Sequence, residues 1–398
     1  MADIADTVLV HRASKRDAVP ARAAMAPLDG VSADAWRCLA ARAIEPNGYY
    51  LPDWELAVNA TARGRTGAVA LTAVRDTRLI GLLPVVPMWQ ALKIPLPALV
   101  SADPYGTLCT PLLDREGAEA AALDLMQEAR AAGAHALIVR AAALDGPVMK
   151  AFREELRRDG LRPILLETHL RASLDANRDA EELLQEALGT KKLKELRRQR
   201  NRLADHGEVR FDVARTPQEV SAAVETFLVL EASGWKAQRG TALAQDEGDA
   251  AFIRRATVAL AAHGQCEIIS LSAGKTPVAS GVVLRHGDRA FFFKLGVDER
   301  FAKFSPGVQL TLDLTRYLCA DPAIRFADST AAPDHPMINP IWRSRLAIGD
   351  VLIPLHRHGV VVPLIRAALA LRKVIREPAR RAVHLLRQRR ESRQEKSA

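Results

Sequence analysis

Residues 290–310 read AFFFKLGVDERFAKFSPGVQL, and this stretch decides the fold that the sequence predicts. The aromatic run at 291–293 favours a β-strand, because aromatic residues are enriched in strands. After a short polar loop, Ser-Pro-Gly at 305–307 opens an apolar segment, 308–318, that predicts a helix. Serine suits the N-cap, and proline suits the first turn, where its missing N–H is not needed. A strand that leads into the free N–H groups of a helix start can hold a phosphate there.

The length and composition predict a globular protein of two domains. The chain has 398 residues, of which 48% are hydrophobic and 26% are charged, both ordinary values. We expect no transmembrane helix, because no stretch approaches 18 apolar residues. The first 30 residues lack the continuous apolar core of a signal peptide. The four cysteines are far apart in the sequence and predict reduced thiols in a cytoplasmic protein, without a metal site.

The positive charge is concentrated at the C-terminus. The net charge is +9, and residues 361–398 hold eleven Lys/Arg and three Glu, or +8, which leaves about +1 elsewhere. A near-neutral body argues against nucleic-acid binding by the fold itself. The basic tail also contains apolar residues, a pattern that suits an anionic membrane or an acidic partner such as a polysaccharide synthase. A solvated helix is the alternative, and the membrane interpretation would place the protein peripherally at the inner membrane.

The order of predicted elements repeats in the two halves of the chain. The first half predicts helices at 36–43 and 51–63, a hairpin of 67–74 and 79–86, a helix at 118–132, a strand at 134–141 and a helix at 146–159. The second half predicts a strand at 171–174, one or two helices over 179–206, a strand at 208–214 and helices at 216–233 and 250–263. It then predicts a meander of 265–272, 278–285 and 289–295, a helix at 308–319 and a strand at 324–327. We therefore expect an α/β fold with domains at 1–165 and 166–358, followed by a basic amphipathic tail, 359–398.

A strongly basic helical run lies at 191–203, KKLKELRRQRNRL. It is either a solvated helix face or a wall that attracts the phosphate of an acyl carrier, a nucleotide or an acidic glycan. Arg198 is our candidate contact to such a phosphate. The sequence contains neither a P-loop motif nor a Rossmann glycine motif.

Two further segments carry polar groups that suit a reaction site. Glu231, Trp235 and Lys236 end a predicted helix and could orient a substrate, although Trp235 could equally anchor a core and Lys236 stabilise the helix end. Asp328 ends a strand, and His335 follows in a loop, where it is either a base that titrates near neutrality or merely exposed. With Asp298, which follows the central strand, these residues give three candidate bases: Asp298, Asp328 and His335.

In combination, these residues resemble a known family. Residues 231–243 and 294–307, together with the basic helix before Gly207, resemble the GNAT-type acyltransferases associated with bacterial cellulose and exopolysaccharide synthesis. The resemblance is best over 170–345 and weaker in the first half, at Trp36, Asn47, Trp54 and 81–84. The chain departs from the family at Val297, where tyrosine is common, and at 334–337, where a Tyr-Lys pair is common.

The resemblance implies two GNAT-like domains, each a mixed, mostly antiparallel sheet flanked by helices, in the arrangement of the Fem-type aminoacyltransferases. It implies transfer of an acyl group from acetyl-CoA or another acyl-CoA to an amine or hydroxyl, with a sugar or exopolysaccharide precursor as acceptor. The carrier would lie beside 290–296, with its pyrophosphate at 305–308. The implied cofactor-binding residues are Phe304, Ser305, Pro306, Gly307, Val308 and Arg198. The implied substrate-binding residues are Glu231, Trp235, Lys236, Lys294 and Trp342.

Two alternatives remain open at this level. In the first, the protein is an aminoacyl transferase that uses aminoacyl-tRNA and binds RNA through residues 191–202 and the tail. In the second, it is a non-catalytic scaffold of a membrane polysaccharide synthase, in which the tail matters and the pocket does not.

Overall fold

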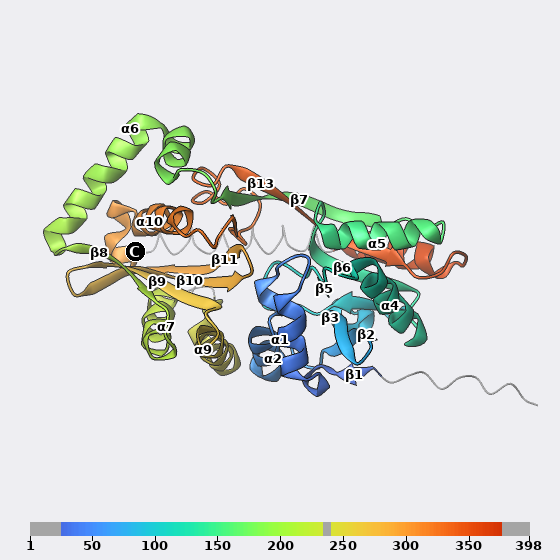
Figure 1. Cartoon of the computed structure of the whole chain (residues 1–398). Coiled ribbons are helices and arrows are strands. Elements are labelled where there is room, and N and C mark those ends of the chain that lie inside the picture. Colours follow the sequence, from blue (N-terminus) through green and yellow to red (C-terminus); the bar gives the residue numbers. More distant parts are fainter. Residues whose placement is uncertain (1–24, 234–239, 376–398) are drawn as a thin grey trace, which may run out of the picture.

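The computed structural model describes residues 25–233 and 240–375, in which the strands form one sheet of 13 strands (Figure 1). The order is β1-β2-β3-β4-β6-β13-β7-β12-β11-β10-β9-β8, with β5 paired to β3. Neighbours are antiparallel except for β4 with β6 and β11 with β12. This architecture confirms the expected mixed, mostly antiparallel α/β fold flanked by helices.

The N-terminal half, residues 25–163, contributes one end of the sheet. Its elements are β1 (Ala26–Pro27), α1 (Ala33–Ala41), α2 (Pro52–Thr61), β2 (Val69–Arg75), β3 (Arg78–Pro87), α3 (Met88–Leu92), β4 (Ala98–Ser101), β5 (Leu112–Leu113), α4 (Ala118–Ala131), β6 (Ala136–Ala143) and α5 (Pro147–Arg158). The predicted hairpin is confirmed as β2 and β3.

The C-terminal half, residues 164–354, contributes the other end. Its elements are β7 (Ile164–Asp175), α6 (Ala180–Leu203), β8 (Val209–Ala214), α7 (Pro217–Ala232), α9 (Glu247–Ala261), β9 (Cys266–Ala273), β10 (Thr276–His286), β11 (Arg289–Val297), α10 (Pro306–Ala320), β12 (Phe326–Asp328) and β13 (Ser344–Pro354). The predicted meander is confirmed as β9, β10 and β11. In Figure 1, α7 and α9 cover one face of these strands, and α10 and α6 lie on the other.

Strand β13 was not predicted, and it joins the two ends of the sheet. It pairs with β6 through residues 348–354 and with β7 through residues 344–352. The sheet therefore continues from one half into the other, and β13, the last strand within the described residues, lies between strands of the first and second halves. The two halves share this sheet, so the sheet does not mark a boundary between them. The predicted domains at 1–165 and 166–358 stay a prediction.

The central helix α10 begins at Pro306, two residues before the predicted start. Ser305 precedes it in a left-handed conformation, with φ of 53°, and its side chain makes no capping hydrogen bond. The backbone carbonyl of Ser305 instead accepts a hydrogen bond from the Gln309 N–H at 3.0 Å. Proline thus takes the first-turn place that the sequence indicates, whereas the serine side chain does not act as the cap.

An aromatic cluster packs the two halves together. The Trp54 ring of α2 meets the Phe252 ring of α9 edge-on, with centroids 4.9 Å apart, and the Phe293 ring of β11 at the same distance. Tyr49 contacts Phe291 and Phe293 from the loop before α2. Edge-to-face pairs add roughly 0.5–1.5 kcal/mol each to the burial of their surfaces. The halves therefore meet through a shared apolar core beside β11.

A buried histidine also crosses between the halves. The Asn47 N–H donates to His286 Nδ1 at 2.9 Å, and His286 Nε2 lies 2.9 Å from the Ala40 carbonyl. Nδ1 accepts a hydrogen bond and so carries no proton, which leaves Nε2–H to donate to Ala40 in the neutral ring. Burial lowers the pKa of His286 from its usual 6.5.

We predict that the free energy of unfolding falls as the pH drops below about 6.5, partly through His286. Below that pH the histidine of the unfolded chain binds a proton, whereas the buried ring of the folded protein stays neutral. Proton binding therefore stabilises the unfolded state relative to the folded state. His286→Gln keeps an acceptor and a donor but cannot titrate, so this variant should lose less stability than the wild type between pH 8 and pH 5 in urea titrations. His263→Gln, at an exposed ring, is the control. Equal pH dependence of the wild type and His286→Gln would contradict the assignment.

Candidate functional site

Beyond Asp328, where β12 (Phe326–Asp328) ends, the chain separates from β11, and β11 continues without β12 beside it. β11 pairs with β12 only from Arg289 to Phe291, whereas it pairs with β10 as far as Val297. The β10 pairing also shifts, because Val282 faces Lys294 and Val283 faces Phe292. Phe293 is therefore the extra residue of a β-bulge, a feature that turns side chains to new directions and recurs beside active sites.

A cavity of about 370 Å³ lies at this separation, between the two halves. Its walls come from the loops at 49, 65 and 103–107 of the N-terminal half and from β11 and Thr330 of the C-terminal half. The lining residues are Tyr49, Arg65, Asp103, Tyr105, Gly106, Thr107, Phe293, Lys294 and Thr330. A second cavity of about 380 Å³ shares Asp103, Gly106 and Thr107 and is also lined by Arg140, His169, Arg171 and Asp350, among others. We call the two cavities together the inter-half cleft.

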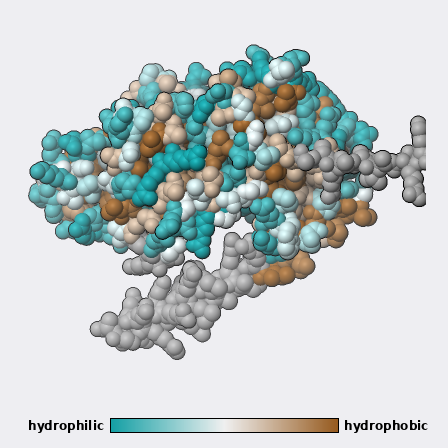
Figure 2. Space-filling view, turned by 90° about the horizontal axis from the view of Figure 1, so that it is seen from below, coloured by the Kyte–Doolittle hydropathy of each residue, from teal (hydrophilic) through white to brown (hydrophobic). Residues whose placement is uncertain are grey.

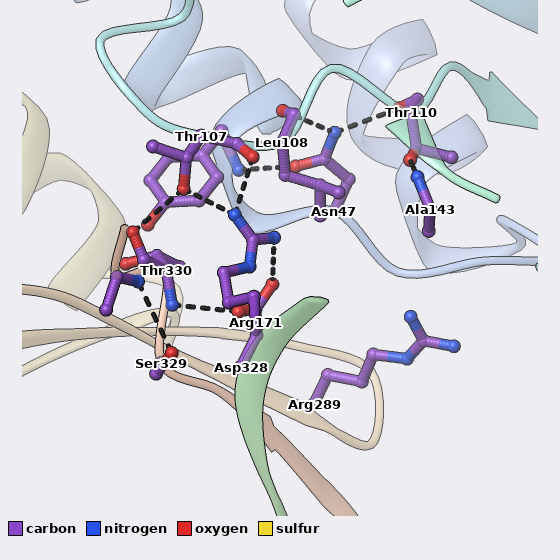
Figure 3. Close-up of polar contacts among 12 residues, drawn as sticks. Asn47, Thr107, Leu108, Thr110, Ala143, Arg171, Arg289, Asp328, Ser329 and Thr330 are labelled. Carbon is purple, nitrogen blue, oxygen red and sulfur yellow. Dashed lines mark hydrogen bonds and ion pairs between the residues drawn. The ribbon is translucent and has the colours of Figure 1, made fainter. Parts of the chain in front are cut away.

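A buried ion pair supports the cleft (Figure 3). Arg171 of β7 donates from Nη2 to Asp328 Oδ2 at 2.6 Å, and both side chains are at most 1% exposed. Arg171 Nη1 donates to the Thr107 carbonyl at 2.8 Å and to its Oγ1 at 2.7 Å. Asp328 Oδ1 accepts from the Thr330 N–H at 2.8 Å. The pair thus ties β7 and the end of β12 to the loops that line the cleft.

The two loops also bond to each other and to the central strand. Thr107 Oγ1 donates to the Thr330 carbonyl at 3.0 Å, and Thr330 Oγ1 donates to the Phe292 carbonyl at 2.6 Å. Asn47 holds the other end of the 107–110 segment through its side-chain amide, which donates to the carbonyls of Leu108 and Thr110. Figure 3 shows these contacts converging from both halves.

Tyr49 is one of the incompletely satisfied polar groups of the cleft, as are Arg65 Nε and Arg171 Nε. Its side chain is fully buried, and its hydroxyl makes no well-formed hydrogen bond within the described part of the chain, although the Thr330 side chain lies near it. Its ring packs against Gly106, where a Cβ atom would lie 2.3 Å from the ring. Burial raises the pKa of Tyr49, so the hydroxyl keeps its proton. A protonated hydroxyl that makes no well-formed hydrogen bond in a cavity wall is suited to donate one to a ligand.

The structure brings together two of the residues predicted to bind substrate. Lys294 Nζ lies 3.4 Å from Glu231 Oε1, and the carboxylate also accepts from the Leu243 N–H at 2.8 Å. Lys294 also lies over the rings of Tyr105 and Phe293, at 5.5 and 5.7 Å. Glu231 is buried at the end of α7, so it holds Lys294 at the cavity wall. Trp235 and Lys236 lie outside the described residues.

Asp298 lies apart from the inter-half cleft. It follows β11, seven residues beyond Phe291, the partner of Asp328, which corresponds to a separation on the order of 20 Å along an extended strand. It lines a different cavity of about 550 Å³ with Glu299, Arg300 and residues of α7. Hydrogen bonds from Arg300 lower the pKa of Asp298, which weakens it as a proton acceptor.

The other two residues predicted as bases, Asp328 and His335, already accept hydrogen bonds within the protein. Both oxygens of Asp328 already accept hydrogen bonds, from Arg171 and the Thr330 N–H. His335 is half-buried in the loop after β12, where its Nδ1 accepts from the Met337 N–H at 3.3 Å. Trp342 is a buried core residue whose indole N–H donates to Thr315 Oγ1 at 2.9 Å, and it lines none of these cavities.

The predicted phosphate-binding residues surround the start of α10. Phe304, Pro306 and Gly307 are buried, and Ser305 and Val308 are half-buried. A Cβ at Gly307 would meet side chains of Leu295, Val297 and Met337 at 3.0 to 3.3 Å, so the close approach that glycine permits is to protein. Arg198 is exposed on α6, two residues from the buried Leu196 and hence on a different side of that helix.

Sequence reasoning missed most of the cleft. Tyr49, Arg65, Asp103 and Thr107 come from loops of the N-terminal half, where no motif marks them. Arg171 does leave a signal, because an arginine in the predicted strand at 171–174 needs a partner if it is buried. His169 lines the second cavity, and burial lowers its pKa, so it is a neutral imidazole near pH 7.

Within residues 25–233 and 240–375, no group of three or more His, Cys, Asp or Glu side chains could hold a metal ion.

We predict that Asp328→Ala lowers the free energy of unfolding by about 3–5 kcal/mol, because it leaves Arg171 buried without its counter-charge. The double variant Arg171→Met/Asp328→Leu should lose less than Asp328→Ala, since it buries no charge. Glu186→Ala breaks an exposed pair with Arg178 at the same 2.6 Å distance and should cost less than about 1 kcal/mol. Urea titration measures all three, and a small, equal loss for both single variants would refute a structural role for the pair.

Comparison with known proteins gives a family match for part of the chain. Residues 190–334 match the model of the acetyltransferase (GNAT) domain. No match was found among curated proteins. The described helices and strands of that region include α7, α9, β9, β10, β11, α10 and β12, and so the bulge and the strand separation lie within it.

Solved structures share the fold of more than four fifths of the chain. FemX aligns with a TM-score of 0.53 and 11% identity, over 81% of this chain and 96% of FemX. The C-terminal domain of a candidate lysylphosphatidylglycerol synthetase from Agrobacterium fabrum aligns with a TM-score of 0.51 and 13% identity, over 85% of this chain and 96% of that domain. A conserved protein of unknown function from Bacteroides thetaiotaomicron aligns with a TM-score of 0.50 and 12% identity, over 81% of this chain and 98% of that protein. The protein thus shares its overall fold with FemX, and its residues 190–334 match the acetyltransferase (GNAT) domain.

Proposed function

We propose that the protein transfers an acyl group from an acyl-CoA thioester to an amine or hydroxyl, with the reacting groups meeting in the inter-half cleft. The observation that carries the proposal is that the chain leaves β11 where β12 ends, close to the bulge of β11 and beside a cavity with a buried hydroxyl that makes no well-formed hydrogen bond. The separation leaves room beside the central strand of a domain whose family is named for acetyl transfer.

The carrier would extend along β11 from the bulge toward the start of α10. Helix N-termini carry partial positive charge and free N–H groups, which favour a pyrophosphate. The candidate contacts are Phe304, Ser305, Pro306, Gly307 and Val308, with Arg198 as a distant cation. Phe304, Pro306 and Gly307 are buried, so the half-buried Ser305 and Val308 are the accessible members at the helix start, and the exposed Lys303 lies beside them in the sequence.

The acceptor would reach the thioester from the cleft. Its nitrogen or oxygen forms a bond to the carbonyl carbon, the carbon–sulfur bond breaks, and the thiolate leaves. The Tyr49 hydroxyl is placed to donate a hydrogen bond to the carbonyl oxygen as it gains charge. Asp103 lines both cavities and is our choice for the group that accepts the acceptor's proton, in preference to Asp298, Asp328 and His335.

The acceptor class that the family resemblance favours is a sugar or an exopolysaccharide precursor. The main rival is an aminoacyl-tRNA as donor, which one observation favours. Most cations of the basic run on α6 are exposed: Lys191, Lys192, Lys194, Arg197, Arg198 and Arg202. Such a surface attracts nucleic acid in a salt-dependent manner.

The first test is titration calorimetry of the full-length protein with acetyl-CoA, longer acyl-CoAs and free coenzyme A. We expect one binding site per chain for at least one acyl-CoA. Absence of heat for all of them would contradict the acyl-CoA proposal. Transfer activity that RNase abolishes and that falls steeply with salt would instead support the aminoacyl-tRNA rival.

The second test compares two adjacent buried tyrosines. Tyr49→Phe removes a hydroxyl that makes no well-formed hydrogen bond, so it should leave folding stability unchanged and lower kcat/KM by roughly tenfold or more. Thiol release from acyl-CoA in the presence of amine and sugar acceptors measures this activity.

Tyr50→Phe is the matched control. The Tyr50 hydroxyl donates to the Ala102 carbonyl at 3.3 Å, and the residue lines neither cavity of the cleft. This variant should lose about 1 kcal/mol of stability and keep its activity. An unchanged kcat/KM in Tyr49→Phe would remove Tyr49 from the mechanism.

A further inference from the structure

Exposed apolar side chains gather on one surface away from the cleft. Of the ten large hydrophobic residues that are exposed in the described part of the chain, six come from α3 and from 360–375. They are Trp89 (58% exposed), Val360 (79%), Leu364 (52%), Leu371 (61%), Val374 (67%) and Ile375 (62%). Figure 2 shows apolar surface gathered at the lower right of the face that it draws. We call these six residues the apolar patch.

The helix at 361–375 carries apolar residues on two sides. Ile365 is fully buried and, with Val361, Val362 and Leu369, packs onto a small core formed by Met88, Val100 and Leu352, among others. Leu364, Leu371 and Ile375 recur at intervals of seven and four residues, which places them in one outward stripe. A helix that only covers a core has a polar outer face, so this outer stripe points to a second apolar contact.

A groove with cationic edges runs beside the stripe. It encloses about 510 Å³ between residues 92–95 and the helix, and its lining is apolar except for Lys93 and Arg372. Lys93 also lies over the Trp89 ring at 5.8 Å. Residues 361–375 contain three cations, Arg366, Arg372 and Lys373, and no carboxylate. Lys373 pairs with Glu167 at 3.1 Å, at the margin of the helix.

The sequence beyond Ile375 adds to the same charge. It continues for 23 residues that contain eight Lys/Arg and three Glu. Apolar side chains, an exposed tryptophan and lysine or arginine together match the interface of an anionic bilayer, where acyl chains meet phosphate groups. An acidic protein partner would pair with the lysine and arginine side chains, but its polar surface would not bury the apolar outer stripe.

We propose that the apolar patch docks the protein onto a membrane of anionic phospholipid. The stripe of Leu364, Leu371 and Ile375, with Trp89, enters the acyl boundary, and Lys93, Arg366 and Arg372 face the lipid phosphates. The described part of the chain has no helix long and apolar enough to cross a membrane. The contact is therefore peripheral, and it does not depend on the reaction in the cleft.

The test is co-sedimentation of the full-length protein with vesicles of phosphatidylcholine alone or mixed with phosphatidylglycerol. We expect binding to the mixed vesicles that weakens with salt, and much weaker binding to phosphatidylcholine. Leu371→Asp/Ile375→Asp should reduce binding to the mixed vesicles by roughly tenfold or more, since it removes apolar contacts and adds negative charge. Both side chains are exposed, so the variant should keep the wild-type thermal unfolding curve.

Val74→Asp/Val229→Asp is the matched control, because it makes the same charge change at two exposed valines elsewhere (56% and 69%). It should bind as the wild type does. Equal binding by both double variants, or no binding by the wild type, would overturn the proposal. So would a wild-type dimer in sedimentation velocity that the patch variant abolishes without any lipid binding, since a second copy would then be the occupant.

Discussion

The structure around the cleft depends on the ion pair between Arg171 and Asp328. Both groups are removed from water, which costs several kcal/mol per charge, and the pair offsets that cost only because each member has further hydrogen bonds. Arg171 binds Thr107 in the N-terminal half, and Asp328 binds the Thr330 N–H in the C-terminal half. One pair therefore fixes the relative positions of two loops that are more than 220 residues apart in the chain.

The opening beside β11 follows from this arrangement. After Asp328 the chain leaves the sheet, and Thr330 adopts a positive φ of 49° while its hydroxyl bonds the Phe292 carbonyl. β12 therefore stops at the point where β11 forms its bulge, and the central strand continues without β12 at its side. The aromatic cluster of Trp54, Phe252 and Phe293 packs the N-terminal half against this region, so the cleft has walls from both halves.

Parts of this site could be predicted from sequence, and others could not. The stretch at 290–310 correctly indicates strand, loop and helix, and Glu231 and Lys294 meet although they are 63 residues apart. Asp328 does end a strand near the cleft, but it lines neither cavity and is one half of a buried ion pair. Tyr49 and Thr107 had no local signal, because their role comes from contacts with strands of the other half. Strand β13 was missed because its residues pair with β6 and β7, which are remote in sequence.

The sequence by itself determined the local elements: the β9–β11 meander, the start of α10 near Pro306 and the concentration of positive charge after residue 360. These follow from side-chain periodicity, turn residues and composition, which act within a few residues. Only the tertiary structure decided that the halves share one sheet, that Asp298 and Asp328 lie in different places, and that the helix at 361–375 carries an outward apolar stripe. Those facts depend on which strands pair and which surfaces become buried, and no local pattern encodes contacts between residues hundreds of positions apart.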